Sequence, residues 1–218
     1  MNKVVAESLQ LVLTDIVSDA GTRTVDGRVR RGAENRSALV EALVSLYEEG
    51  ELTPTATQIA DRAGVAVRSV YGHFGDVETL AAEVSQRQWQ VHGRLMDPEP
   101  IPGTLDERVD ELVARRAELF EAVAPVRRAG MLHAHHNETI AANLRVLARR
   151  FRTQVAQTFA PELDLVGRAR TAELLEAADL LLAWESWERL RSQQGCSPAR
   201  ARRVLASALI HLLDPSRE

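Results

Sequence analysis

The residues of this chain best suited to chemistry are a group of histidines and one cysteine. His133, His135 and His136 lie close together, and His136 with Glu138 has the His-x-Glu spacing of zinc deaminases. Such a site also needs a Pro-Cys-x-x-Cys segment, which Cys196, the chain's single cysteine, cannot supply. The His-Glu-x-x-His spacing of zinc hydrolases is also absent from the sequence. We therefore expect no metal site.

Other catalytic motifs are missing from the sequence. It contains no phosphate-binding glycine loop, no Gly-x-Gly-x-x-Gly motif after a strand and no Gly-x-Ser-x-Gly nucleophile elbow. Cys196 stands between Gly195 and Ser197, a setting more typical of a surface or packed thiol than of a nucleophile. We expect a protein that is not an enzyme and has no cofactor.

Composition narrows the class of protein further. The chain has 218 residues, of which 45% are hydrophobic and 27% charged, as in soluble globular proteins. One cysteine excludes an internal disulfide, and Met1–Ala20 lacks the apolar core of an export signal, so we expect a cytoplasmic protein without membrane contact. The net charge of −4 argues against non-specific coating of nucleic acid, but leaves room for a local DNA-binding surface.

Apolar residues recur at three- and four-residue spacing, which predicts helices throughout. Thr55 and Gln58 form a capping box for a short helix, although Thr53 as cap with Pro54 as first helical residue is an alternative. The helices expected in the first block include Leu39–Leu46 and end at Gly50, then span Thr55–Ala63, Val67–Phe74, and Asp76, as N-cap, to about Met96.

The proline-rich segment Asp97–Gly103 separates this block from a second helical block. The helices expected there run from the Thr104–Glu107 capping box to about Pro125, then over Arg128–His135, Glu138–Phe159, Arg168–Gln194, and from the Ser197-Pro198 start to Leu213. The predicted fold class is all-α. Its expected parts are an N-terminal extension or arm (1–32), a three-helix helix-turn-helix DNA-binding domain (33–80) and a helical bundle for ligand binding and dimerisation (81–218).

The segment Thr55–Phe74 has the pattern of a helix-turn-helix. Gly64 marks the turn, and the small residues Ala60 and Ala63 allow the two helices to cross closely. Arg68 and Ser69 lie near the start of the second helix, where such motifs face base edges in the major groove. A three-helix bundle that binds no DNA is the alternative.

The same stretch, from about Arg36 to Leu80, resembles the signature of tetracycline-repressor (TetR) family transcription regulators. The resemblance rests on Ile59-Ala60, Ala63-Gly64-Val65, Val70-Tyr71-Gly72-His73-Phe74, Gly75-Asp76 and Glu78. It implies a dimeric protein that binds double-stranded DNA and responds to a small molecule.

The resemblance also implies roles for individual residues. Phosphate contacts fall to Thr55, Tyr71 and His73, and base contacts to Val67, Arg68, Ser69 and Gly72. Arg68 is the best candidate for a guanine, which its paired donors match. Tyr71 could instead be a packed core aromatic.

Two positions depart from the family pattern. Val77 stands where the family usually has a phosphate-binding lysine, and Gly72 where a larger residue is common. Compensation could come from a flexible, glycine-punctuated arm over Asp26–Gly32 that enters a minor groove. The cations proposed for this purpose are Arg28, Arg30 and Arg31, with Arg36 as a phosphate contact; the alternative is a solvated charged linker.

The two C-terminal helices have broad apolar faces, which could pack within the chain or on a second copy. In the family they form a four-helix dimer interface, and a two-fold dimer suits a palindromic operator with half-sites about 34–36 Å apart.

The resemblance and the amphipathic phase of the middle helices place an effector site among them. The candidate lining residues are Trp89, His92, Met96, Phe120, Met131, His133, Asn137, Leu144, Leu147, Phe151 and Trp184. Ordinary core packing is the alternative for each. Few aromatics and many Leu and Ala residues favour an apolar or amphipathic effector.

The sequence thus predicts a ligand-responsive repressor, released from a palindromic operator when an effector shifts the helix from Asp76 to Met96. The alternative is a helical interaction or sensor protein whose DNA-binding module has lost strong operator affinity.

Overall fold

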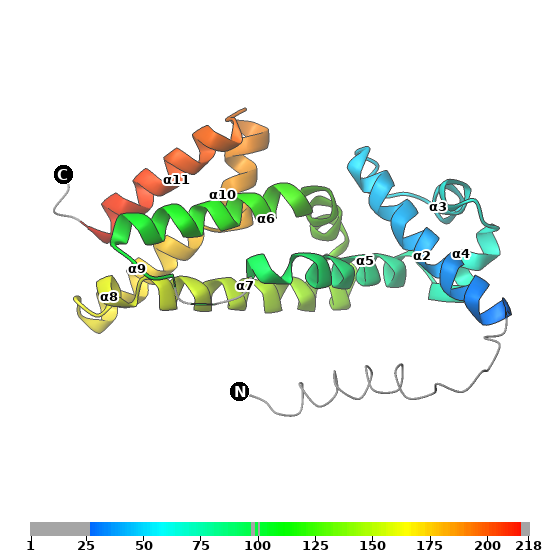
Figure 1. Ribbon diagram of the computed structural model, residues 1–218, viewed down its shortest axis with the longest axis horizontal. Helices are drawn as coiled ribbons and strands as arrows, with labels where there is room; N and C mark the ends of the chain where they lie inside the picture. The colour runs from blue at the N-terminus through cyan, green and yellow to red at the C-terminus, as the bar shows by residue number, and fades with distance from the viewer. Residues whose placement is uncertain (1–26, 97–98, 100, 215–218) are drawn as a thin grey trace, which may run out of the picture. The chain divides into compact units, whose positions relative to one another are not determined.

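All regular elements in the described part of the chain are helical, which confirms the predicted all-α class. The computed structural model describes residues 27–96, 99 and 101–214, without the side chains of Arg28, Trp89, Gln90 and Met96. The elements are α2 (Gly27–Glu48), α3 (Ala56–Ala63), α4 (Val67–Phe74), α5 (Val77–His92), the 3₁₀ turn η1 (Gly93–Met96), α6 (Leu105–His133), α7 (Glu138–Thr158), α8 (Ala160–Leu163), α9 (Arg168–Leu181), α10 (Trp184–Glu188), the π-helical turn η2 (Arg189–Gln193) and α11 (Pro198–Leu213) (Figure 1).

The chain divides into a first unit that ends at Ser37 and a second unit that begins at Ala38. The described part of the first unit is the start of α2, so the predicted flexible stretch over Asp26–Gly32 is wrong from Gly27 onward. Arg30 Nε lies 3.5 Å from Glu34 Oε1, one helical turn away. This i,i+4 pair and the good helix propensity of arginine favour the helix despite the two glycines.

Local capping fixes the start of α3. The Thr55 hydroxyl accepts from the Gln58 amide at 3.3 Å, and the Thr55 amide donates to Gln58 Oε1 at 2.8 Å. The capping box is therefore confirmed, and the Thr53–Pro54 alternative is wrong. Gly64, with φ of 68°, ends α3 in the left-handed conformation that glycine adopts most readily.

The predicted starts of three later helices are also confirmed. Asp76 Oδ1 accepts from the Thr79 amide at 2.7 Å, and Thr104 and Glu107 form a capping box. Ser197 Oγ accepts from the Arg200 amide at 3.3 Å, with Pro198 as the first residue of α11.

The predicted helix end near Pro125 is wrong, because α6 runs without interruption to His133. A proline inside a helix removes one hydrogen bond and costs about 3 kcal/mol. Val123, Val126 and Ala129 on both sides of Pro125 are buried, and their packing offsets this cost.

The single helix predicted over Arg168–Gln194 is also wrong. The chain leaves helical geometry at Ala183, whose ψ is 156°, and then forms α10 and η2. Trp184 and Trp187, which follow the break, are both buried, with 5% and 1% of their surface exposed. Burial of two large aromatic side chains outweighs the hydrogen bonds lost at the break.

Two buried clusters form the core of the second unit. The larger one joins α6, α7, α9, α10 and α11. The smaller one is the helix-turn-helix core, which includes Leu43, Ile59 and Val70 and extends to Val126 of α6 and Ile140 of α7. The motif is therefore continuous in packing with one end of the helical bundle.

Candidate DNA-binding face and ligand cavity

The helix α4 has one buried and one exposed face. Val70 and Phe74 are buried in the helix-turn-helix core. Arg68, Tyr71 and Gly72 are exposed and share the opposite face at i, i+3 and i+4 spacing. This is the arrangement that a recognition helix needs to present side chains to a groove.

Arg68 is the cation of this face. Its side chain makes no hydrogen bond or ion pair with the described residues, so all its donors are available to a ligand. Val67 and Ser69, on either side of it, are partly buried, and Val67 packs against the helix-turn-helix core. Of the four predicted base-contacting positions, Arg68 and Gly72 are therefore the most accessible.

The aromatic candidates of α4 differ in environment. Tyr71 is 56% exposed, so the packed-core alternative for it is wrong. His73 is partly buried, and its ring meets the edge of the Phe74 ring with a centroid distance of 6.3 Å. The Thr55 side chain is exposed at the start of α3, but its hydroxyl donates to Gln58 Oε1 at 2.8 Å, a bond that a phosphate would have to replace.

Another arginine of the motif is held by a neighbouring helix. Arg62 donates from Nη1 and Nη2 to the two Glu49 carboxylate oxygens, at 2.8 and 2.6 Å, and Nη1 also donates to Ser45 Oγ. These hydrogen bonds lower the pKa of the Glu49 carboxyl. Arg62 thus ties α3 to the end of α2 and is not a free cation for DNA.

The first unit contributes the remaining predicted cations. Arg30 and Arg31 are exposed on α2, and Arg36 is partly buried. The side chain of Arg28 lies outside the described residues. Their helical setting replaces the flexible arm that the sequence suggested, and no observation tests their contact with DNA.

The apolar faces of the C-terminal helices are largely used within the chain. Leu174 and Ala178 of α9 and Leu205 and Leu209 of α11 are buried in the larger cluster. Leu180 and Val204 remain 66% and 43% exposed.

A cavity of about 60 Å³ lies between α5, α6 and α7. It is lined by Ser85 and Gln88 of α5, by Val123, Val126, Arg127 and Gly130 of α6, and by Ile140, Asn143, Leu144 and Leu147 of α7. Among the residues predicted to face an effector, Leu144 and Leu147 lie in this wall. The other eight were missed, although Val123, Val126, Arg127 and Gly130 repeat at helical spacing around one charged residue.

The polar groups of the cavity wall lack partners. Arg127 Nε and Nη1 and Gln88 Oε1 are buried and form no hydrogen bond. Burial lowers the pKa of the Arg127 guanidinium, and the nearby charge of Glu185 offsets this only in part.

The structure places the other predicted effector residues elsewhere in the fold. Phe120 packs edge-on against Phe151 and Trp184, with centroid distances of 6.0 and 5.6 Å, and all three are buried in the larger cluster. Arg116 covers the Phe151 ring, 3.5 Å from its centroid, and burial lowers the pKa of this arginine to about 9.

The remaining candidates lie at the ends of helices. Asn137 caps α7, its Oδ1 accepting from the Ile140 amide at 3.0 Å. Met131 is 37% exposed, and His92 is partly buried. His133 is partly buried, with a buried Nε2 that forms no hydrogen bond. The side chains of Trp89 and Met96 lie outside the described residues.

Two searches of the described residues found no further class of site. They contain no group of three or more His, Cys, Asp or Glu residues that could hold a metal ion. None of their helices has both the length and the apolar character needed to cross a membrane.

Comparison with solved structures identifies the fold. The chain is similar to a transcriptional regulator from Rhodococcus sp. Rha1, with a TM-score of 0.64 and 16% identity over 82% of this chain and 95% of that one. A TetR-family member from Streptomyces coelicolor A3 gives 0.53 and 19% over 83% and 91%. A protein from Mesorhizobium loti MAFF303099 that is assigned to the TetR family gives 0.57 and 20% over 84% and 96%. No protein-family model and no curated protein sequence matches the chain. The fold is therefore that of TetR-family transcriptional regulators.

Proposed function

We propose that this protein is a dimeric transcriptional repressor of the TetR type that leaves its operator when a small molecule binds. The observation that carries the proposal is the exposed face of α4. Arg68, Tyr71 and Gly72 share this face, while the helix-turn-helix core buries the opposite one. On this proposal the protein is not an enzyme and acts in the cytoplasm.

The cavity between α5, α6 and α7 is the proposed effector site. Helix α5 begins two residues after α4 ends and brings Ser85 and Gln88 to the cavity wall. Typical ligand pockets have volumes of about 300–1,000 Å³, so a ligand can enter this small cavity only if the three helices separate. A separation that moves α5 also moves the adjoining recognition helix. A differential affinity of about 1–3 kcal/mol between the two arrangements would change operator binding by several-fold to about a hundredfold.

Dimerisation through α9 and α11 supplies the second recognition helix. The exposed side chains of Leu180 and Val204 support this choice of surface, since such residues lose water contact on association. A two-fold dimer would bind two half-sites of a palindrome.

Selection of binding sites from random duplex DNA tests the proposal. The purified protein should enrich a palindrome, and Arg68→Ala should weaken binding to it by about 1–3 kcal/mol and relax the preference at one base position. Arg170→Ala is the matched control, because Arg170 pairs with Glu173 in α9 and should not affect binding. If a confirmed dimer enriches no sequence at low salt, the repressor proposal fails.

The second candidate is an interaction or sensor protein with weak DNA affinity. Two observations favour it: Val77 packs against the helix-turn-helix core instead of presenting a cation, and Glu49 occupies Arg62. Salt dependence separates the candidates, because each true phosphate contact adds a slope of about −0.9 in log affinity against log salt. A slope near zero would favour the interaction protein.

A further inference from the structure

The chemistry of the α5–α6–α7 cavity points to a class of ligand, given that the proposed function makes this cavity the effector site. Most of its wall is aliphatic, with Val123, Val126, Ile140, Leu144 and Leu147 contributed by two helices. Such a wall favours an apolar chain, because each buried methylene group stabilises binding by about 0.8 kcal/mol.

One cation interrupts this aliphatic wall. Arg127 Nε and Nη1 are buried and form no hydrogen bond with any described residue. Glu185 acts on Arg127 only through its longer-range charge, without a hydrogen bond or ion pair. A buried charge without a direct partner is costly unless a ligand supplies the opposite charge.

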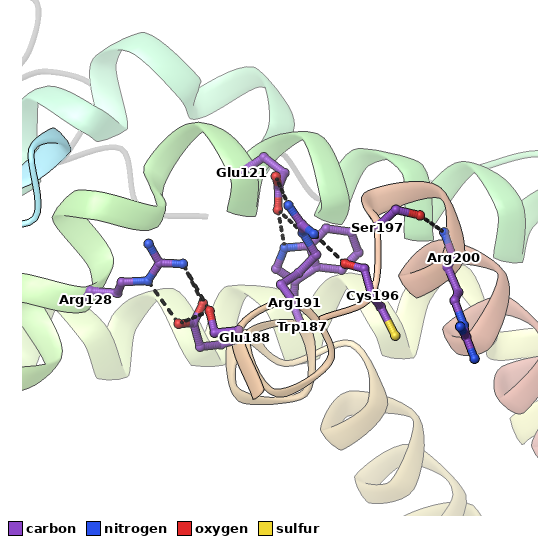
Figure 2. Close-up of polar contacts among 9 residues, drawn as sticks. Glu121, Arg128, Trp187, Glu188, Arg191, Cys196, Ser197 and Arg200 are labelled. Carbon is purple, nitrogen blue, oxygen red and sulfur yellow. Dashed lines mark hydrogen bonds and ion pairs between the residues drawn. The ribbon is translucent and has the colours of Figure 1, made fainter. Parts of the chain in front are cut away.

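The neighbouring arginine shows how this chain satisfies a guanidinium elsewhere. Arg128 donates from Nε and Nη2 to the two carboxylate oxygens of Glu188, at 2.9 and 3.1 Å, as Figure 2 shows. Arg127 has no such carboxylate, although it follows directly in the same helix. The difference marks Arg127 as a group whose partner comes from outside the chain.

A second polar group stands in the same wall. Gln88 Oε1 is buried without a hydrogen bond, on α5. An amide beside a guanidinium can orient one carboxylate, since the amide group also carries two N–H donors.

We propose that the effector is an amphipathic anion, whose carboxylate pairs with Arg127 and whose apolar chain lies against Val126, Leu144 and Leu147. The carboxylate supplies the charge and acceptors that Arg127 lacks. The chain separates α6 from α7 as it enters, because the cavity is too small for it otherwise. A neutral molecule would leave the guanidinium unpaired, and a cation would be repelled by it.

Three probes with the same alkyl chain and different head groups test this class of ligand. Decanoate is an anion, 1-decanol is neutral and decyltrimethylammonium is a cation. Their binding to the DNA-free protein is measured by titration calorimetry. Decanoate should bind about tenfold to a hundredfold more tightly than decanol, as expected for a charge-assisted hydrogen bond, and the cation should bind most weakly.

Two variants of adjacent arginines locate the head group. Arg127→Met should abolish the advantage of decanoate over decanol and leave decanol binding nearly unchanged. Arg128→Met, the matched control, should keep the wild-type ranking, because Arg128 already has Glu188 as its partner. An equal loss in both variants would overturn the assignment of Arg127.

Gly130→Ala locates the alkyl chain without endangering the fold. A Cβ atom at Gly130 would lie 3.9 Å from Ile140 Cγ2, an ordinary contact, and would reduce the space in the cavity. Decanoate and decanol should both bind less tightly to this variant. Unchanged affinity for both would overturn the proposed location.

The outcomes for ligand class and for function are distinguishable, because calorimetry needs no DNA. If the protein selects a palindrome but binds decanoate no better than decanol, or does not bind it, the ligand class is wrong and the repressor proposal stands. If decanoate binding depends on Arg127 but no DNA is selected, the ligand class stands and the repressor proposal fails.

Discussion

Val126 of α6 and Ile140 of α7 both line the ligand cavity, and both lie in the buried cluster that contains Ile59 and Val70 of the helix-turn-helix. A ligand that displaces either side chain therefore disturbs the packing that supports α3 and α4. The cavity and the DNA-binding motif need no separate pathway between them, because they share these side chains.

This shared packing predicts that Ile140→Val changes DNA binding in the absence of any effector. The substitution removes a methylene group from a side chain with 1% exposure and should lower the free energy of unfolding by about 0.5–1.5 kcal/mol. Operator affinity should fall several-fold, because the altered cluster supports the recognition helix less well. Chemical denaturation and operator titration measure the two effects.

Ile101→Val is the matched control for this prediction. Ile101 is also buried, at 6% exposure, but it lies in the larger cluster of the bundle. The control should lose similar stability and keep its operator affinity. Equal losses of affinity in the two variants would show that the effect is general destabilisation.

Gly72 offers a way to add a DNA contact without disturbing the fold. A Cβ atom at this position would meet no atom within 4 Å. Gly72→Ala should raise stability by up to about 1 kcal/mol, since glycine in a helix interior is unfavourable. Gly72→Lys should add a phosphate contact and steepen the salt dependence of DNA binding by about 0.9 log units per log unit of salt.

The Gly72→Ala variant separates the two effects of this substitution. It should keep the wild-type salt slope, because it adds no charge. If Gly72→Lys also keeps that slope, α4 does not lie against the DNA backbone, which would contradict its proposed role.

The features that the sequence predicted well are those set by near neighbours. The caps at Thr55, Asp76, Thr104 and Ser197 each use a hydrogen bond to a residue three positions away. Such bonds depend on local residue types alone, so the motif boundaries and the helix-turn-helix could be predicted.

The features that the sequence did not predict depend on residues far away along the chain. The helix continues through Pro125 because tertiary packing buries the residues on both sides of it. Aromatic and histidine side chains were the natural candidates for a ligand site, but Phe120, Phe151 and Trp184 lie in the larger cluster, and the cavity contains Arg127 instead. That a charged side chain is enclosed becomes evident only when α5 and α7 are placed over α6.

Arg108 and Glu162 form an ion pair inside the bundle, which predicts an asymmetry between single and double variants. Their Nη2–Oε1 distance is 2.5 Å, and their side chains are 8% and 14% exposed. Arg108→Met should cost about 3–5 kcal/mol of stability, because it leaves the Glu162 carboxylate buried without its partner. The double variant Arg108→Met/Glu162→Met should recover much of this loss.

Chemical denaturation of the two variants and the wild type measures this asymmetry. Arg170→Met is a suitable control, because its pair with Glu173 is exposed and should contribute less than about 1 kcal/mol. A single-variant cost as small as that of the control would mean that water reaches the Arg108–Glu162 pair.

Glu121 predicts a dependence of stability on pH. Its carboxylate accepts from Arg191 Nε at 2.8 Å and from Trp187 Nε1 at 2.9 Å (Figure 2). The hydrogen bonds from Arg191, and to a lesser degree from Trp187, hold the pKa of Glu121 below its usual range. A carboxyl group with a lowered pKa in the folded state stabilises the fold above its unfolded pKa, about 4.3, and this contribution disappears as the pH falls through the lowered value.

Arg191→Met should therefore raise the pKa of Glu121 toward its ordinary value, as carboxyl-carbon NMR would measure. The variant should be less stable than the wild type at pH 7, and the difference should shrink as the pH falls below about 4, where the carboxylate is protonated in both proteins. Arg189→Met is the control, since Arg189 is an exposed neighbour with no contact to Glu121. A stability difference that stays constant from pH 7 to about pH 3 would show that Arg191 stabilises the fold through its packing or through its bond to the Cys196 carbonyl, and not through Glu121.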